Sequence, residues 1–462
     1  MNTNPYLTSL PHPRPDLLAP EGLDQNTGTA EILRLPEVKS IVTSDFVVLP
    51  CDLVCELGGD RLLQAWMVKS ASLPELLGDS SGLRSGGLGV WYETKTETPI
   101  KGEETDFIAT VPLPAESSAA QKGPLLPNIS KLVYSIPTDS LNDLMEERKG
   151  LPLRHSLLRR HPRIRMLTTH RDAHIYIFPH WILQFVSEND QMESIGEDVI
   201  GWWAKAGWQT GLSEKLGMAK IFGPAERQGK IGSAEGGRGS PDESDREEFR
   251  RRSSTTSTTT GKDQSPRGDS RAAEGGRETV PPMLAYTHPS QPTAPLIRRV
   301  DTARLLLAIS LQLAKLPSVE ELGPEAASPF AHPRKVAYPE GVKPRTTITK
   351  QDSLVAENVT VEEKTSIKES VIGSNCQINE GAKLSQCLLM DGVVVGKNCK
   401  LTRCILGKRS EIGDGSILTD CEVQENLLVE PKCKPSDTFH APPKKKKKNT
   451  PYMFVCMLTS LR

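Results

Sequence analysis

The residues best suited to chemistry are the cysteines, nine in all, because clustered thiolates bind soft metals such as zinc. One set of positions recurs every 17 residues and reads Ser370, Cys387, Cys404 and Cys421. This spacing puts one side chain on each turn of a repeated structure, in a row with steps of about 4.8 Å. Zinc requires four ligands around one point. The pattern therefore favours small packing residues and free thiols, and it predicts no metal and no cofactor.

Two aspartates stand where an acidic side chain could serve a metal or a nucleotide. Asp52 ends the run Phe-Val-Val-Leu-Pro-Cys, which is typical of a buried parallel strand that delivers a side chain to a site. The alternative is a buried strand that stops at a solvated aspartate, and this segment alone favours the alternative. Asp301 precedes an apolar helix. His170, His174 and His180 lack carboxylates at ligand spacing, so we predict no metal site there.

The elements that must position the cysteines come from an aliphatic repeat between Val355 and Val429. Aliphatic residues recur at intervals of six, six and five, so the pattern returns every 17 residues. A unit this short cannot bury its own apolar face, so neighbouring units must stack. The repeat predicts a left-handed parallel β-helix of about five triangular coils. The predicted inward ladders are Val355, Ile372, Leu389 and Leu406, and Val361, Ile378, Val395 and Ile412.

Small residues support the same register. One small side chain stands two residues before an inward aliphatic in each coil, where a crowded corner admits little volume. Glycines are expected to give the turns conformational freedom. The small residues are Thr365, Ala382, Cys399 and Ser416, and the glycines are Gly373, Gly396, Gly407 and Gly413.

The first two thirds of the chain alternate between strand and helix patterns, which predicts an α/β domain. Four tryptophans, Trp181, Trp202, Trp203 and Trp208, are expected to pack in its core or between its helices. A helix at 301–316, capped near Asp301 or Thr302, is apolar nearly all round and is expected to be buried. The other strand patterns lie at 46–52, 107–111, 131–136, 164–167 and 174–178, and the other helical patterns at 60–69, 140–148, 181–185 and 195–206.

Composition sets the remaining boundaries. The formal net charge of −1 gives no indication of a nucleic-acid partner, and no run reaches the roughly 20 apolar residues of a membrane span. Gly, Ser, Thr and charged residues dominate one long segment, which predicts disorder. We expect an irregular start (1–26), an α/β domain (27–222 and 283–316), a disordered insertion (223–282), a linker (317–345), the β-helix (346–431) and a Lys-rich tail (432–462).

An α/β domain followed by a hexapeptide β-helix resembles the sugar-1-phosphate nucleotidyltransferases, such as mannose-1-phosphate guanylyltransferase. Gly28-Thr29-Ala30 is similar to their GTA turn, and Asp52 and Asp301 correspond to their metal-binding aspartates. The resemblance implies a Rossmann-like fold, incomplete at the N-terminus, with a vestigial nucleotide or metal pocket at Gly28, Thr29, Asp52 and Asp301. No G-x-G-x-R loop precedes Gly28 to cradle a triphosphate, so we expect no nucleotidyltransferase activity.

Four segments carry a closer resemblance, to the gamma-subunit family of eukaryotic translation initiation factor 2B, the guanine-nucleotide exchange factor for initiation factor 2. It implies a non-catalytic scaffold or regulatory subunit in the cytosol that pairs with epsilon and the other subunits and supports exchange on initiation factor 2. It implies no membrane and no direct nucleic-acid contact. Epsilon carries exchange activity in an extra helical domain, whereas a short Lys-rich tail follows the β-helix here. The segments are 30–38, 45–53, 194–200 and 297–302.

Two other functions remain as alternatives. One is a sugar-1-phosphate nucleotidyltransferase whose N-terminal segment is missing from this sequence. The other is a hexapeptide acyltransferase, but those enzymes use a histidine near the coil interface, and no histidine lies between Val355 and Val429.

Overall fold

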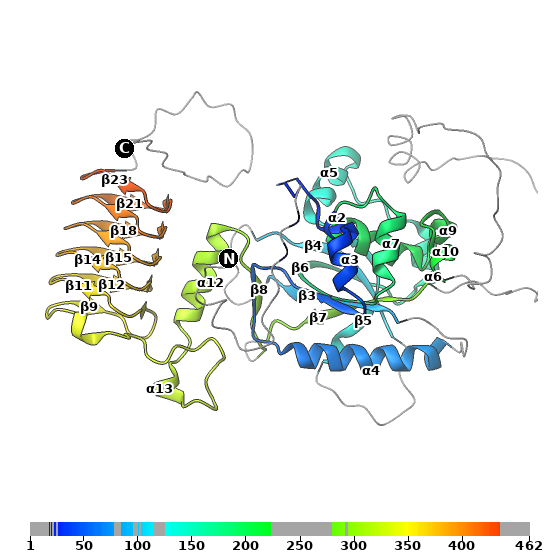
Figure 1. Cartoon of the computed structure of the whole chain (residues 1–462), viewed down its shortest axis with the longest axis horizontal. Coiled ribbons are helices and arrows are strands. Elements are labelled where there is room, and N and C mark those ends of the chain that lie inside the picture. Colours follow the sequence, from blue (N-terminus) through cyan, green and yellow to red (C-terminus); the bar gives the residue numbers. More distant parts are fainter. Residues whose placement is uncertain are drawn as a thin grey trace, which may run out of the picture.

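The computed structural model describes residues 18, 20, 23–24, 26–77, 85–95, 100, 103–113, 125–222, 280–291 and 294–434. An α/β part and a parallel β-helix lie side by side, with helix α12 (Ala303–Ala314) between them (Figure 1). The predicted architecture of an α/β domain followed by a β-helix is confirmed. The predictions for most of the insertion, the first residues and the Lys-rich tail fall outside the described residues.

The α/β part contains a six-stranded mixed sheet in the order β1-β6-β3-β7-β5-β4. Only β3 and β7 pair in parallel; the other neighbours are antiparallel. The prediction that the run before Asp52 is a buried strand is therefore wrong, because β1 is a short antiparallel edge strand on which Val47 is 43% exposed. The strands are β1 (Phe46–Val48), β3 (Gly87–Glu93), β4 (Asp106–Pro112), β5 (Ile129–Ile136), β6 (Arg165–Phe178) and β7 (Met283–His288).

Strand β6 joins what the sequence divides into two strands. Its first half pairs with β4, from Arg165 opposite Thr110, and its second half pairs with β1 and β3. The sequence hides this continuity because polar residues interrupt the apolar pattern midway. His174 adopts a left-handed backbone conformation with φ of 53°, which is uncommon for a residue other than glycine. Its side chain lines the pocket described below.

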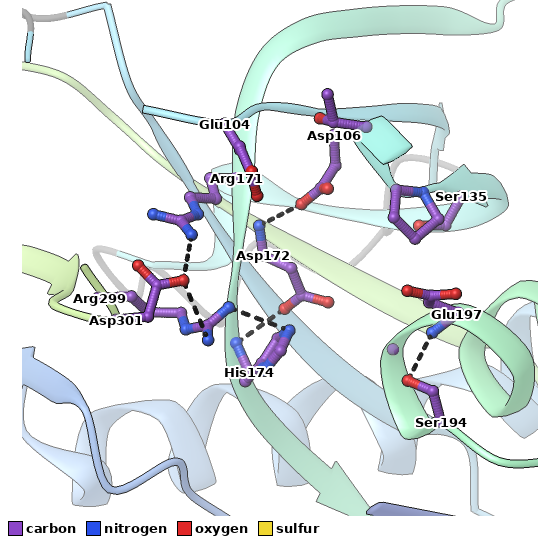
Figure 2. Close-up of a pocket in the computed structure, with 13 residues that line it drawn as sticks. Glu104, Asp106, Ser135, Arg171, Asp172, His174, Ser194, Glu197, Arg299 and Asp301 are labelled. Atoms are coloured by element: carbon purple, nitrogen blue, oxygen red, sulfur yellow. Dashed lines mark hydrogen bonds and ion pairs between the residues drawn. The ribbon is translucent and has the colours of Figure 1, made fainter. Parts of the chain in front are cut away.

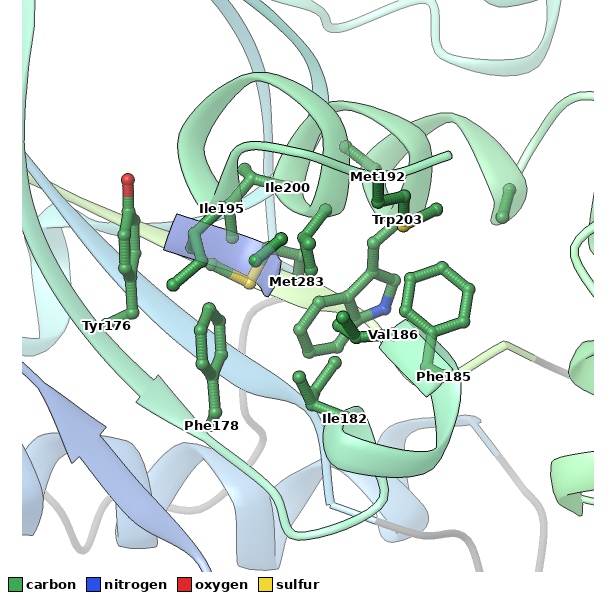
Figure 3. Close-up of a cluster of buried hydrophobic side chains, with 14 of the residues drawn as sticks. Tyr176, Phe178, Ile182, Phe185, Val186, Met192, Ile195, Ile200, Trp203 and Met283 are labelled. Carbon is green, nitrogen blue, oxygen red and sulfur yellow. The ribbon is translucent and has the colours of Figure 1, made fainter. Parts of the chain in front are cut away.

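The larger hydrophobic core lies between the sheet and the helices that follow β6 (Figure 3). Trp203 and Phe178 are buried at its centre, and Trp181 meets Trp203 edge-on with ring centroids 4.9 Å apart. The packing predicted for these tryptophans is confirmed. The helices of this part are α2 (Thr29–Arg34), α3 (Pro36–Ile41), α4 (Gly59–Leu77), α5 (Thr138–Arg148), α6 (His155–Arg160), α7 (Ile182–Glu188), α8 (Ile200–Ala206), α9 (Leu212–Lys215) and α10 (Met218–Phe222), with a 3₁₀ turn at Leu126–Asn128 and a π-helical turn at Ile195–Val199.

Helix α12 follows a two-stranded ribbon of β2 (Leu53–Cys55) and β8 (Ile297–Arg299), and it packs on β13 and β16 of the β-helix. Thr302 caps it by accepting a hydrogen bond from the Leu305 backbone N–H, as the sequence predicts. The predicted all-round burial is wrong: only Leu305, Ile309 and Ala314 are buried, because the β-helix covers one side of the helix. At its other end, Lys335 Nζ donates to the carbonyls of Ala314 and Leu316, 2.5 Å away in each case.

The β-helix stacks strands β9 to β23 into three parallel sheets of five strands (Figure 1). Every register steps by 17 residues along the aliphatic ladders, for example Val361, Ile378 and Val395. Val336 and Val342 already pair in parallel with coil residues before the first full coil, and short helical turns lie at Val319–Leu322 (α13) and Pro339–Gly341. The strands are β9 (Thr347–Ile348), β10 (Leu354–Val355), β11 (Thr360–Val361), β12 (Ser366–Lys368), β13 (Val371–Ile372), β14 (Gln377–Ile378), β15 (Lys383–Ser385), β16 (Leu388–Leu389), β17 (Val394–Val395), β18 (Lys400–Thr402), β19 (Ile405–Leu406), β20 (Glu411–Ile412), β21 (Ile417–Thr419), β22 (Glu422–Val423) and β23 (Leu428–Val429).

The four glycines predicted to loosen the turns have another role. None of them adopts a positive φ; that conformation is carried in the coils mostly by residues such as Asn358, Asn375 and Asn398. A Cβ on Gly413 would lie 2.4 Å from the backbone nitrogen of Pro431 in the next coil. These glycines are therefore required because adjacent coils approach closely, which is a contact that local sequence does not reveal.

Candidate functional site

One pocket lies where β4, β6, the π-helical turn and the ribbon strand β8 converge (Figure 2). Its volume is about 160 Å³, and charged side chains dominate its lining. Acidic residues outnumber arginines there. The charged and histidine lining residues are Glu104, Asp106, Asp172, Glu197, Asp301, Arg171, Arg299 and His174, and Ser135, Pro137, Thr138, Ser194 and Gly196 complete the wall.

Both aspartates singled out in the sequence pair with arginine. Arg299 Nη2 lies 3.0 Å from Asp52 Oδ2 and 3.6 Å from Asp301 Oδ2. Arg171 Nη2 lies 2.6 Å from the same Asp301 oxygen. The structure thus brings Asp52 and Asp301 together around Arg299, although only Asp301 lines the pocket. Because guanidinium groups already neutralise both carboxylates, neither is free to hold a divalent cation.

Gly28 and Thr29 lie behind the pocket wall and do not line it. A Cβ on Gly28 would be 2.1 Å from the Glu193 carbonyl oxygen, so only glycine permits this approach. Thr29 Oγ1 accepts a hydrogen bond of 2.9 Å from the Ile195 backbone N–H. The pair therefore fixes the turn that carries Ser194, and its contribution to the pocket is positional.

A buried carboxyl pair forms the floor of the pocket. The Asp172 backbone N–H donates to Asp106 Oδ2 at 2.7 Å, and Tyr176 donates its hydroxyl proton to Asp172 Oδ2 at 2.6 Å. Burial raises the pKa of Asp172 to about 6. Burial, followed by repulsion from Asp172, also raises the pKa of Asp106 to about 6. This floor repels anions near neutral pH.

His174 faces the same cluster from the strained position on β6. Its backbone N–H donates to Asp172 Oδ1, and Arg299 Nη1 donates to its Nε2 at 3.3 Å. Burial, followed by the positive charge of Arg299, lowers the pKa of His174 to about 4. The ring is consequently neutral at physiological pH and adds no positive charge to the site.

The sequence reasoning missed four residues that shape this pocket: Asp106, Arg171, Asp172 and Arg299. Arg171 and Asp301 are 130 residues apart in the chain, and Arg299 and Asp52 are 247 apart, so no local pattern joins them. The one available signal was the charged pair Arg171-Asp172 inside a strand pattern. A charge pair in a strand interior indicates buried partners elsewhere.

Among the described residues, no group of histidine, cysteine, aspartate or glutamate side chains is arranged to hold a metal. In the cysteine ladder, Cys387 and Cys404 are fully buried, and each thiol donates to a carbonyl of its own coil, those of Ser385 and Thr402. These cysteines fill the coil corners. Within the same residues, no helix has the length and apolar character needed to cross a membrane.

Comparison with known proteins gives two matches. Residues 338–434 match the family model described as the EIF2B subunit epsilon LbH domain, a left-handed β-helix. Translation initiation factor eIF2B subunit gamma of Schizosaccharomyces pombe is 23% identical over 211 residues, which cover 46% of this chain and 39% of that protein. Both matches are to subunits of eIF2B. They support an eIF2B-related chain, and the β-helix is the part that matches a domain model of the complex.

Proposed function

We propose that this chain is a non-catalytic scaffold or regulatory subunit of the cytosolic guanine-nucleotide exchange factor that acts on translation initiation factor 2. In this proposal it resembles the gamma subunit and pairs with an epsilon subunit. The observation that carries the proposal is the match of the β-helix to an eIF2B domain model, together with the similarity to a gamma subunit. The proposed role is assembly, with the exchange chemistry supplied by the partner.

The pocket supports a role without nucleotidyl transfer. A nucleotide triphosphate brings several negative charges, and a site for it needs free cations or backbone N–H groups. Here Arg171 and Arg299 are engaged with Asp52 and Asp301, and the floor is acidic. The arrangement acts as an electrostatic clasp between β6, the β2–β8 ribbon and the start of α12.

The last coil of the β-helix is the surface that we propose for the partner. Within the described residues, no further strand covers β21, β22 or β23, so this end presents unpaired strand edges. Leu428 on β23 is 58% exposed, and Ile417 on β21 is 36% exposed. Exposed aliphatics beside open strand edges fit a second β-helix, stacked end to end. A stable interface of this kind buries roughly 1,200–2,000 Å² or more in total.

Size-exclusion chromatography with purified epsilon subunit tests this assembly. The chain and epsilon should co-elute at micromolar concentration, and Leu428→Asp should weaken the complex because it places a carboxylate among apolar contacts. Glu411→Asp, an exposed position of the same sheet, is the matched control and should co-elute normally. Separate elution of the two wild-type proteins would refute the proposal.

A further inference from the structure

A second surface of the α/β part carries an unusual concentration of positive charge. From Arg148 to Arg165 the sequence contains seven lysines and arginines and no aspartate or glutamate. The segment covers the end of α5, helix α6, a turn and the first residue of β6. It lies within a chain whose net charge is −1, so the concentration is local.

The cations of this segment are largely left without partners. Lys149, Arg159, Arg163 and Arg165 are exposed, and none makes a hydrogen bond or ion pair with another described residue through its side chain. The β-helix behaves differently, because its exposed cations commonly pair with a carboxylate of a neighbouring coil. Examples are Lys343 with Glu362, Lys364 with Glu380, Arg403 with Asp420 and Arg409 with Glu425.

The groups beneath the segment add to the positive charge. Burial, followed by the charge of Arg160, lowers the pKa of Lys131. Burial, followed by the charges of Lys131 and Arg160, lowers the pKa of His161. The nearest acidic ion-pair partner is Glu147 on α5, 3.9 Å from Arg148. The cations therefore repel one another in the free protein.

Exposed aliphatic side chains accompany the arginines. Leu158 on α6 and Met166 on β6 are each 40% exposed, directly beside Arg159 and Arg165 in sequence. Aromatic side chains, on which nucleic-acid bases stack, do not accompany them. Among the described residues, the one large exposed aromatic is Tyr338, which lies at the start of the β-helix.

We propose that the surface formed by residues 148–166 is a docking site for an acidic protein segment that carries aliphatic anchors. Glutamate or aspartate side chains of the partner pair with the guanidinium groups of Arg159, Arg163 and Arg165, whose planar fork matches a carboxylate. Aliphatic side chains of the partner contact Leu158 and Met166. Docking relieves the mutual repulsion of the cations. This site is separate from the β-helix end and does not depend on the proposed pairing with epsilon.

Fluorescence anisotropy with the full chain tests the site. The probe is a short labelled glutamate-rich peptide with leucines at i, i+4 helical spacing. Arg159→Glu/Arg163→Glu/Arg165→Glu should weaken its binding by about tenfold or more, since three contacts become repulsive. The matched control is Lys368→Glu/Lys383→Glu/Lys400→Glu on the β-helix, which changes exposed cations by the same total charge. The control should bind the peptide within about twofold of wild type.

Two further probes separate the contributions. A peptide of the same charge without leucines should bind several-fold more weakly, and a single-stranded oligouridylate of equal charge should also bind more weakly. Oligouridylate binding tighter than the leucine-containing peptide would overturn the proposal in favour of RNA. Equal losses in the two triple variants, or no peptide binding up to about 1 mM, would also overturn it.

Discussion

Ile378 stands at the middle of an inward ladder, and its replacement by alanine measures how far the stacked coils depend on aliphatic packing. The side chain is fully buried, with Val361 and Val395 as its neighbours in the coils before and after. Removing a buried aliphatic side chain of this size costs about 2–5 kcal/mol of unfolding free energy, because transfer and cavity terms add. Coils contact mainly their neighbours, so this loss divides the stack at its centre.

The placement of tryptophans allows the two parts of the chain to be followed separately. All six tryptophans precede residue 209, so tryptophan fluorescence reports the α/β part, whereas far-ultraviolet circular dichroism reports both parts. In urea, Ile378→Ala should lower the midpoint of the circular-dichroism transition more than that of the fluorescence transition. Gln377→Ala, on the exposed face of the same strand, is the control and should stay within about 0.5 kcal/mol of wild type. A loss below that value in Ile378→Ala, or an equal loss in the control, would refute the packing account.

Three other predictions concern the α/β part and its junction with the β-helix. The pKa of folded His174 lies below that of a free histidine, so the wild type loses stability as pH falls from about 6.5 to about 4; urea titrations should show His174→Asn, which tolerates a positive φ, gaining stability relative to wild type across that window, and a pH-independent difference would contradict the shift. Lys335→Met leaves the carbonyls of Ala314 and Leu316 without their donor and should cost about 1–3 kcal/mol by urea unfolding, with Lys350→Met, at an exposed position, as a control near zero. Incubation with GTP, mannose-1-phosphate and magnesium should release no pyrophosphate above the blank; turnover that is lost in Asp52→Ala would favour a nucleotidyltransferase.

The β-helix could be predicted from sequence because its determinants are local and repeated. Each coil repeats one aliphatic pattern, so an error at one position, such as Glu411 in a strand, is corrected by the others. The role of Gly413 was not predictable, because it depends on the distance to the following coil.

The α/β part was predicted in its elements and missed in its pairing. Individual strands such as β4 and β5 follow from apolar runs, but the antiparallel position of β1 depends on β6, more than a hundred residues later in the chain. The pocket was missed for the same reason. Asp52 and Asp301 are visible as candidates, but the arginine that joins them is identified only once β2 pairs with β8.

The most direct test of the proposed function is the rate of GDP release from initiation factor 2. The isolated chain should give no acceleration, and its addition to epsilon should raise the rate above that of epsilon alone. Acceleration by the isolated chain, or an unchanged rate when it is added to epsilon, would contradict the account.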